Sequence, residues 1–207
     1  MGSVDDRTHP GSYAPTAVTT HMEQLVREFI GSVLWLDTLA LEVVLEMRHP
    51  VTTKVLTSVT GLGSATAALV FVGLFFLAGW NDEAGQALVT LTVAGVVVGT
   101  LMVTIQRAFP PQPVCLTDGA ETVAHSFPSG HAAAVTGFAM VARESDELPF
   151  GVAATLAAVI AFSRVYLGTH YLSDTLVGVA IGVGSFLVAR WLLARVEPPT
   201  VSEERRG

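Results

Sequence analysis

Two long stretches of the chain contain no charged side chain. No Asp, Glu, Lys or Arg lies between Lys54 and Asp82, or between Glu83 and Arg107. A helix needs about 20 apolar residues to cross a bilayer, and each stretch is long enough to supply them. Three further apolar runs follow toward the C-terminus. The pattern therefore predicts five membrane-spanning helices, at about 52–79, 84–107, 128–141, 150–166 and 170–193.

Residues 22–48 follow a different pattern. Apolar side chains recur there every three or four positions, which predicts a helix. The segment also carries acidic residues at Glu28, Asp37, Glu42 and Glu46, and an ionised group near the bilayer centre costs roughly 2.5–3.5 kcal/mol. We therefore interpret this segment as an amphipathic helix that lies at the membrane interface. A tilted span packed against the bundle is the alternative.

These segments together predict an all-α protein, a polytopic membrane helical bundle of about five transmembrane helices with an N-terminal amphipathic helix. Residues 1–21 are polar and lack the apolar core of a signal peptide, so we expect a disordered lead-in. Residues 22–195 are expected to form a single membrane domain, with the five-span core at 52–195. Residues 196–207 are expected to form a charged tail.

The composition agrees with a membrane protein. Of the 207 residues, 51% are hydrophobic and 14% are charged, and the mean hydropathy is +0.56. The formal net charge of −7 excludes the basic composition that is typical of nucleic-acid-binding proteins. Glycine is also spaced for close helix packing in lipid, with Gly95 four residues before Gly99 and Gly178 four before Gly182.

A polar cluster, HSFPSGHAAA, begins at His125 and opens the third predicted span. Proline suits the first turn of a helix, because its missing N–H would have no partner there. Ser129, Gly130 and His131 then offer backbone N–H groups and an imidazole at a helix N-terminus, where anions such as phosphate bind. A serine that only caps the helix is the alternative. We interpret His125 as a loop histidine.

A second cluster, SRVYLGTHYLSD, lies between the last two predicted spans. Arg164 ends one span and offers a planar guanidinium that suits phosphate oxygens. His170 begins the next span, and Asp174 lies four residues further on the same helix face. A carboxylate there can hold the tautomer of a histidine, which can then act as a nucleophile toward phosphorus. A purely structural pair is the alternative.

The order of the spans brings both clusters to one membrane face. The second span ends at this face, the third begins at it, the fourth returns to it and the fifth leaves from it. We therefore expect a site built from Arg107, Ser129, His131, Arg164, His170 and Asp174. More arginines lie at the opposite face, so the positive-inside rule predicts an outward-facing site and a cytoplasmic C-terminus in a cell membrane.

These residues resemble the type 2 phosphatidic acid phosphatase (PAP2) and vanadium haloperoxidase superfamily. Two of its three signature motifs are complete: PSGH, and Ser163-Arg164 followed by five residues, His170, three residues and Asp174. The likeness covers about 52–195 and implies a phosphatase that uses neither a metal nor a cofactor. It implies that His170 attacks phosphorus and becomes a phosphohistidine, that Asp174 orients His170, and that His131 protonates the leaving oxygen.

The resemblance also implies a phosphate pocket formed by Arg164, Ser129 and the N–H of Gly130. The chain departs from the family at the first motif, which has Lys, six residues and then Arg-Pro. The corresponding sequence here is IQRAFPPQP, with Gln112 at the place of the arginine and no lysine at the matching distance. Arg107 and Gln112 are the residues expected to take these places in the phosphate pocket.

The leading hypothesis is an integral membrane phosphatase that hydrolyses a lipid phosphate monoester or a polyprenyl or lipid pyrophosphate. Its partners would be that lipid substrate and the surrounding membrane lipids, with no nucleic acid. A catalytically weakened PAP2-fold protein that binds or transports a lipid phosphate is the alternative. Vanadate-dependent haloperoxidase chemistry shares the motifs, but those relatives are soluble. The sequence leaves the oligomeric state open.

Overall fold

The computed structural model describes residues 17–111, 113–114 and 125–196, and these ranges contain helices and no strand. The all-helical prediction is therefore confirmed for the part of the chain that the structure describes. The elements in chain order are α1 (Ala17–Met47), α2 (Pro50–Thr60), the 3-10 helix η1 (Gly61–Gly63), α3 (Ala65–Leu77), α4 (Asn81–Ile105), α5 (Gly130–Glu144), α6 (Phe150–Tyr166) and α7 (Leu172–Val196).

The chain divides into two compact units, Met1–Leu36 and Asp37–Gly207. In the first unit the structure describes the N-terminal part of α1, which begins at Ala17, earlier than the predicted start. Side chains 21–32 of this helix are exposed. The rest of the predicted lead-in and nearly all of the predicted tail lie outside the described residues. The position of α1 at a membrane interface stays a prediction.

Two of the described helices, α4 and α7, are long and apolar enough to cross a membrane on their own. The predicted span at 52–79 is instead broken into α2 and α3, which meet at an angle of 58° across η1. At this break Gly63 packs against α5 and α6: a Cβ there would lie 2.8 Å from Ile160 Cγ2 and 3.1 Å from His131 Cδ2. The Ser64 side chain then caps α3 by accepting from the Ala67 N–H, so a new helix begins.

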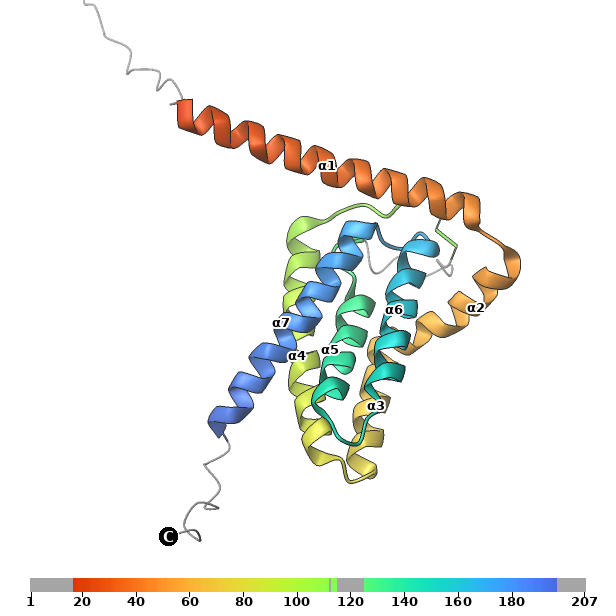
Figure 1. Cartoon of the computed structure of the whole chain (residues 1–207), viewed down its shortest axis with the longest axis vertical. Helices are drawn as coiled ribbons and strands as arrows, with labels where there is room; N and C mark the ends of the chain where they lie inside the picture. Colours follow the sequence, from red (N-terminus) through yellow and green to blue (C-terminus); the bar gives the residue numbers. More distant parts are fainter. Residues whose placement is uncertain (1–16, 112, 115–124, 197–207) are drawn as a thin grey trace, which may run out of the picture. The chain divides into compact units, whose positions relative to one another are not determined.

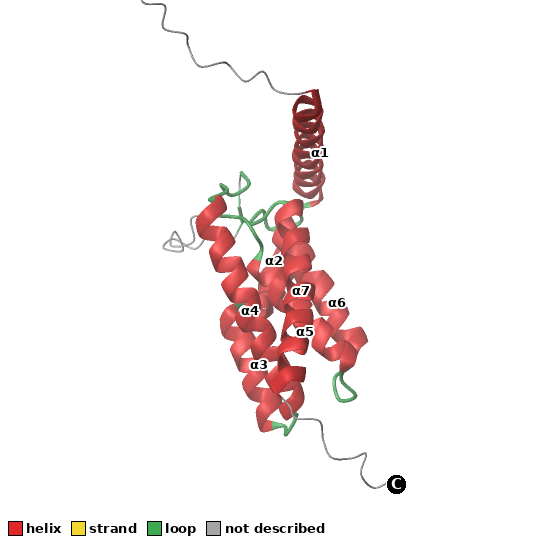
Figure 2. Ribbon diagram, turned by 90° about the vertical axis from the view of Figure 1, so that its left-hand side faces the viewer, coloured by secondary structure: helices red, strands yellow, loops and turns green. Residues whose placement is uncertain are grey.

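In the second unit α5 packs against α4, α6 and α7 (Figure 1). Helices α5 and α6 have 15 and 17 residues, fewer than the about 20 that a full crossing needs. The end of α4, the start of α5, the end of α6 and the start of α7 lie at the same end of this bundle (Figures 1 and 2). The directions in which these helices run therefore bring HSFPSGHAAA and SRVYLGTHYLSD to the same end of the bundle, as the sequence predicts.

Glycines on α7 let it approach α5 closely. A Cβ on Gly178 would lie 2.4 Å from the carbonyl oxygen of Ser129, and one on Gly182 would lie 2.5 Å from that of Ala133. The predicted close packing at this pair is therefore present. The other pair, Gly95 and Gly99, has open space where a Cβ would be. The contact at Gly178 sets the start of α5 directly against α7.

Replacing Gly182 with alanine is expected to lower the free energy of unfolding by about 1–3 kcal/mol, because the methyl group would overlap the α5 backbone. The matched control is Gly184→Ala on the same helix, where a Cβ meets nothing within 4 Å. Thermal unfolding of both variants in detergent measures the difference. Equal unfolding temperatures for the two variants would show that α7 does not pack on α5 through Gly182.

Candidate active site

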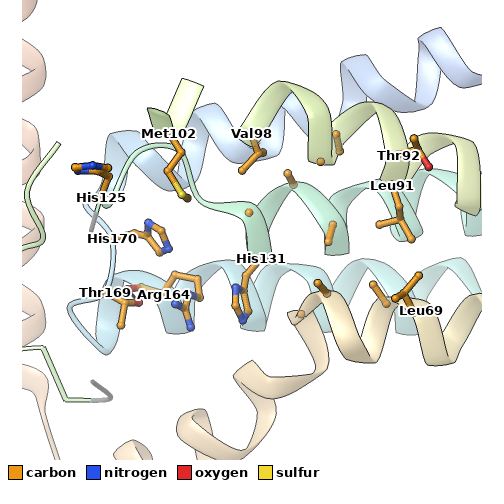
Figure 3. Close-up of a pocket in the computed structure, with 18 of the residues that line it drawn as sticks. Leu69, Leu91, Thr92, Val98, Met102, His125, His131, Arg164, Thr169 and His170 are labelled. Atoms are coloured by element: carbon orange, nitrogen blue, oxygen red, sulfur yellow. Dashed lines mark hydrogen bonds between the residues drawn. The ribbon is translucent and has the colours of Figure 1, made fainter. Parts of the chain in front are cut away.

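A cavity of about 610 Å³ opens between α3, α4, α5 and the end of α6. Most of its lining is apolar, with side chains such as Leu69, Leu91 and Val98. Its polar side chains include His125, His131, Arg164, Thr169 and His170. Figure 3 shows His131, Arg164 and His170 gathered toward one end of the cavity, and Leu69, Leu91 and Thr92 toward the other. The cavity thus has a cationic, imidazole-bearing end and a long apolar remainder.

His170 lies in the turn between α6 and α7 and is buried. The turn includes Gly168, whose φ of 68° suits a residue without a Cβ. The ring atom Nδ1 of His170 lies 2.5 Å from the carbonyl oxygen of Ser126. Because a carbonyl can only accept, Nδ1 carries the proton and donates it. The lone pair is then on Nε2, which is the arrangement that a nucleophilic histidine requires.

The protonation state of His170 follows from its surroundings. Burial lowers its pKa, and the positive charge of Arg164 lowers it further, to about 3. The hydrogen bond to the Ser126 carbonyl acts in the opposite direction and does not offset these effects. His170 is therefore a neutral imidazole at neutral pH, with the Nε2 lone pair available.

His131 and Arg164 complete the polar end of the cavity. His131 lies in the first turn of α5, and Arg164 lies in the last turn of α6. One guanidinium nitrogen of Arg164 donates to the hydroxyl of Thr60 on α2, at 3.0 Å. Helix α2 therefore helps to set the orientation of the arginine. Together these residues place a fixed cation and a second imidazole beside His170 (Figure 3).

Ser129 and Gly130 begin α5. The Ser129 hydroxyl is fully buried and accepts from the Ala132 N–H at 3.4 Å, so it caps the helix. The Ser129 N–H donates to the carbonyl oxygen of Asp174 at 3.1 Å, which joins α5 to α7. Gly130 lines the cavity. The structure therefore gives Ser129 the capping role that the sequence left as an alternative, and brings Gly130 to the cavity.

Asp174 is placed differently from the sequence prediction that it orients His170. Its carboxylate accepts from the Tyr171 N–H at 2.9 Å and from Arg107 at 2.5 Å. The contact that orients His170 comes from the Ser126 carbonyl. The reason is that Asp174 lies in the first turn of α7, where its side chain satisfies a backbone N–H of the preceding turn and faces the end of α4.

Arg107, which was expected in the phosphate pocket, lies just past the end of α4. Its guanidinium forms ion pairs with Asp37, at 2.7 Å, and with Asp174. It also donates to the Ser173 hydroxyl at 2.8 Å and stacks over the Tyr171 ring, 4.0 Å from the ring centre. Burial lowers the pKa of Arg107, but the bonds and charges of the two carboxylates outweigh this effect and raise it. The Arg107 guanidinium is thus bound by two carboxylates. Gln112, which was also expected in the phosphate pocket, lies outside the described residues.

Three residues of the site were not recognised from the sequence. His125 lines the cavity, although its sequence pattern indicated only a loop histidine. Its place three residues before the PSGH motif was a signal that it could reach the same site. Thr60 and Asp37 carried no motif, and their contacts with Arg164 and Arg107 arise from residues far away in the chain.

Comparison with known families assigns the chain to a family. Residues 83–197, more than half of the chain, match the PAP2 superfamily. The chain belongs to the PAP2 superfamily. The resemblance recognised in PSGH and SRVYLGTHYLSD is therefore confirmed, and the PAP2 match includes both motifs.

One relative of this PAP2 protein is a phosphatase. It is 37% identical over 78 residues to decaprenylphosphoryl-5-phosphoribose phosphatase of Mycobacterium tuberculosis. That alignment covers 38% of this chain and 43% of the relative, so less than half of the relative is matched.

Two crystal structures share the fold. One is LpxE of Aquifex aeolicus, with a TM-score of 0.62 and 22% identity over 73% of this chain and 92% of the other. The second is a transmembrane PAP2 type phosphatidylglycerolphosphate phosphatase of Bacillus subtilis, with a TM-score of 0.68 and 20% identity. This alignment covers 87% of this chain and 96% of the other. At these identities the likeness shows the fold alone.

Proposed function

We propose that the protein is an integral membrane phosphatase that hydrolyses a lipid phosphate monoester or a lipid pyrophosphate through a phosphohistidine. The observation that carries this proposal is the position of His170. Its Nε2 is left without the proton, beside Arg164 and His131, at the polar end of a largely apolar cavity. The family membership of the chain agrees with this reading.

The proposed reaction has two displacements at phosphorus. In the first, His170 Nε2 forms a bond to phosphorus while the bond to the leaving oxygen breaks, and His131 donates a proton to that oxygen. In the second, His131 takes a proton from a water molecule, which attacks phosphorus and breaks the P–N bond. Phosphate is released and His170 is regenerated.

Charge stabilisation in this scheme comes from protein groups. The Arg164 guanidinium and the N–H of Gly130, at the N-terminus of α5, are suited to the equatorial oxygens of the phosphoryl group. A fixed cation beside two imidazoles also disfavours a divalent metal ion at the same place, because like charges repel. We therefore propose a metal-independent reaction.

The substrate class is supported by the rest of the cavity. Its walls on α3 and α4 are mostly apolar, as Leu69, Leu88 and Leu91 illustrate, and suit a hydrocarbon chain. The Mycobacterium tuberculosis relative is named for a decaprenyl lipid. A phosphate at the polar end with an apolar chain along these walls is the arrangement that we propose.

The test is phosphate release by the purified protein in detergent, with a metal chelator present. The panel comprises phosphatidate, phosphatidylglycerophosphate and a polyprenyl diphosphate. Release from at least one lipid is expected, together with inhibition by vanadate, which mimics a five-coordinate phosphorus. Binding of these lipids without any release would instead support the alternative of a lipid-phosphate binding protein. The engagement of Arg107 by carboxylates is the observation that favours that alternative, because it removes a cation from the pocket.

Replacing His125 with alanine is expected to lower kcat/KM about tenfold. The His125 ring lines the cavity near His170 and can donate to a substrate phosphate oxygen, and a hydrogen bond to a charged group contributes about 1.5–3 kcal/mol. His125→Gln keeps a donor and should recover part of the activity. The control is His21→Ala, on the exposed part of α1. Steady-state kinetics with the best lipid substrate measures the effect, and identical values for His125→Ala and His21→Ala would exclude this role.

A further inference from the structure

Asp37 is a buried carboxylate that the proposed reaction does not use. It lies on α1, within the unit that contains the site, and its side chain is 3% exposed. Oδ1 accepts from the Ser173 N–H at 2.8 Å, and Oδ2 accepts from the Ser173 hydroxyl at 2.6 Å and from Arg107 at 2.7 Å. A carboxylate with this many donors is held in one orientation, and it holds its donors in turn.

Hydrogen bonds made by Arg107 and Ser126 connect Asp37 to His170. Asp37 binds the guanidinium of Arg107, and the carbonyl oxygen of Arg107 accepts from the Ser126 N–H at 2.7 Å. The Ser126 hydroxyl donates to the carbonyl of Ala108 at 3.0 Å, so two bonds tie Ser126 to the segment that begins at Arg107. The Ser126 carbonyl then accepts from Nδ1 of His170.

A second route reaches the other side of the same turn. Ser173, which Asp37 contacts through both its N–H and its hydroxyl, lies between Tyr171 and Asp174. Arg107 binds Asp174 and stacks on the Tyr171 ring. Asp37 and Arg107 therefore also hold the start of α7, which begins two residues after His170.

We propose that Asp37 is a positioning residue for His170. By fixing Arg107 and Ser173, it holds the Ser126 carbonyl and the start of α7 in the places that set the tautomer and direction of the His170 ring. This inference rests on the proposed function, in which His170 Nε2 attacks phosphorus. It gives the last turns of α1 a part in the site, although no motif on that helix indicates one.

The charges in the network allow Asp37 to be substituted while Arg107 keeps a carboxylate partner. Two carboxylates surround the single guanidinium of Arg107. Asp37→Asn removes one negative charge and leaves Arg107 paired with Asp174. The asparagine has a similar shape, but its NH2 group cannot accept from Arg107 and Ser173 as the carboxylate does. The substitution is therefore expected to change the orientation of Arg107 and Ser173 while Arg107 keeps one carboxylate partner.

The experiment compares wild type, Asp37→Asn, Asp37→Glu and the control Glu42→Gln. Glu42 is on the same helix and is exposed, so its substitution removes the same charge without touching the network. For Asp37→Asn we expect kcat to fall about 10- to 100-fold per folded molecule, with KM nearly unchanged, because misplaced reacting groups slow the chemical step. Asp37→Glu should recover part of kcat. A kcat for Asp37→Asn equal to that of Glu42→Gln would overturn the proposal.

A readout that is independent of turnover separates this proposal from the proposed function. In nitrogen-15 NMR spectra of histidine-labelled protein, wild-type His170 should show the Nδ1–H tautomer, and Asp37→Asn should shift it toward a mixture. If this shift occurs in a protein that releases no phosphate, the positioning role holds and the phosphatase assignment fails. An active protein whose His170 signals do not respond to Asp37→Asn would contradict the positioning role alone.

Discussion

The variant His170→Ala is expected to lose phosphate release by about 10⁴-fold or more, the scale seen when a covalent nucleophile is removed. Alanine has no lone pair that could form the P–N bond, so the two-step route is closed. Labelled substrate should also leave no phosphate on the protein after rapid quenching. Both the rate and the trapped phosphoprotein are measured with the lipid that wild type hydrolyses best.

The matched control for this prediction is again His21→Ala, which removes an exposed histidine far from the site in sequence. Retention of one per cent or more of the wild-type rate in His170→Ala would place the nucleophile elsewhere. The pH dependence gives a second check. Burial and the charge of Arg164 lower the pKa of His170 to about 3, so the ring stays neutral as the pH falls from neutral to about 5. A loss of activity over that range must therefore come from another group.

The second large effect is expected for Arg107→Met, which should lower the free energy of unfolding by about 3–5 kcal/mol. Methionine leaves Asp37 and Asp174, which are 3% and 0% exposed, without the cation between them. Two buried carboxylates would then face each other with too few donors. For a chain of this length the unfolding temperature should fall by about 10 °C.

The control for Arg107→Met is Arg190→Met. Arg190 pairs with Glu144 at the surface, where the two side chains are 55% and 46% exposed, and such pairs contribute about 0–1 kcal/mol. Adding Asp37→Asn to Arg107→Met should restore part of the lost stability, because one unpaired charge is removed. Similar unfolding temperatures for Arg107→Met and Arg190→Met would show that the buried network contributes little.

The motif residues could be placed from the sequence because span direction is a simple consequence of hydropathy. A chain that crosses and returns must bring PSGH and SRVYLGTHYLSD to one end of the bundle, and Arg164, His131 and His170 meet there. The break of the predicted span at 52–79 could not be foreseen in the same way. Its cause is the packing of Gly63 against Ile160 and His131, and those contacts join residues that are far apart in the chain.

The roles of Arg107 and Asp174 show the same limit. From the sequence, each could serve the phosphate or the nucleophile, because charge and helix position suit both. The structure pairs Arg107 with Asp174 and also with Asp37, which lies seventy residues before Arg107. Likewise, the partner of His170 is a backbone carbonyl, and a carbonyl is present at every residue and leaves no trace in a motif.

By itself, the sequence determined the helical membrane fold, the family and the end of the bundle at which the reactive side chains gather, because these depend on local hydropathy and on motif spacing. Only the tertiary structure decided which donor meets which acceptor around His170. Such pairings depend on distances between segments that are remote in the chain, and a difference of about 1 Å decides whether a hydrogen bond forms.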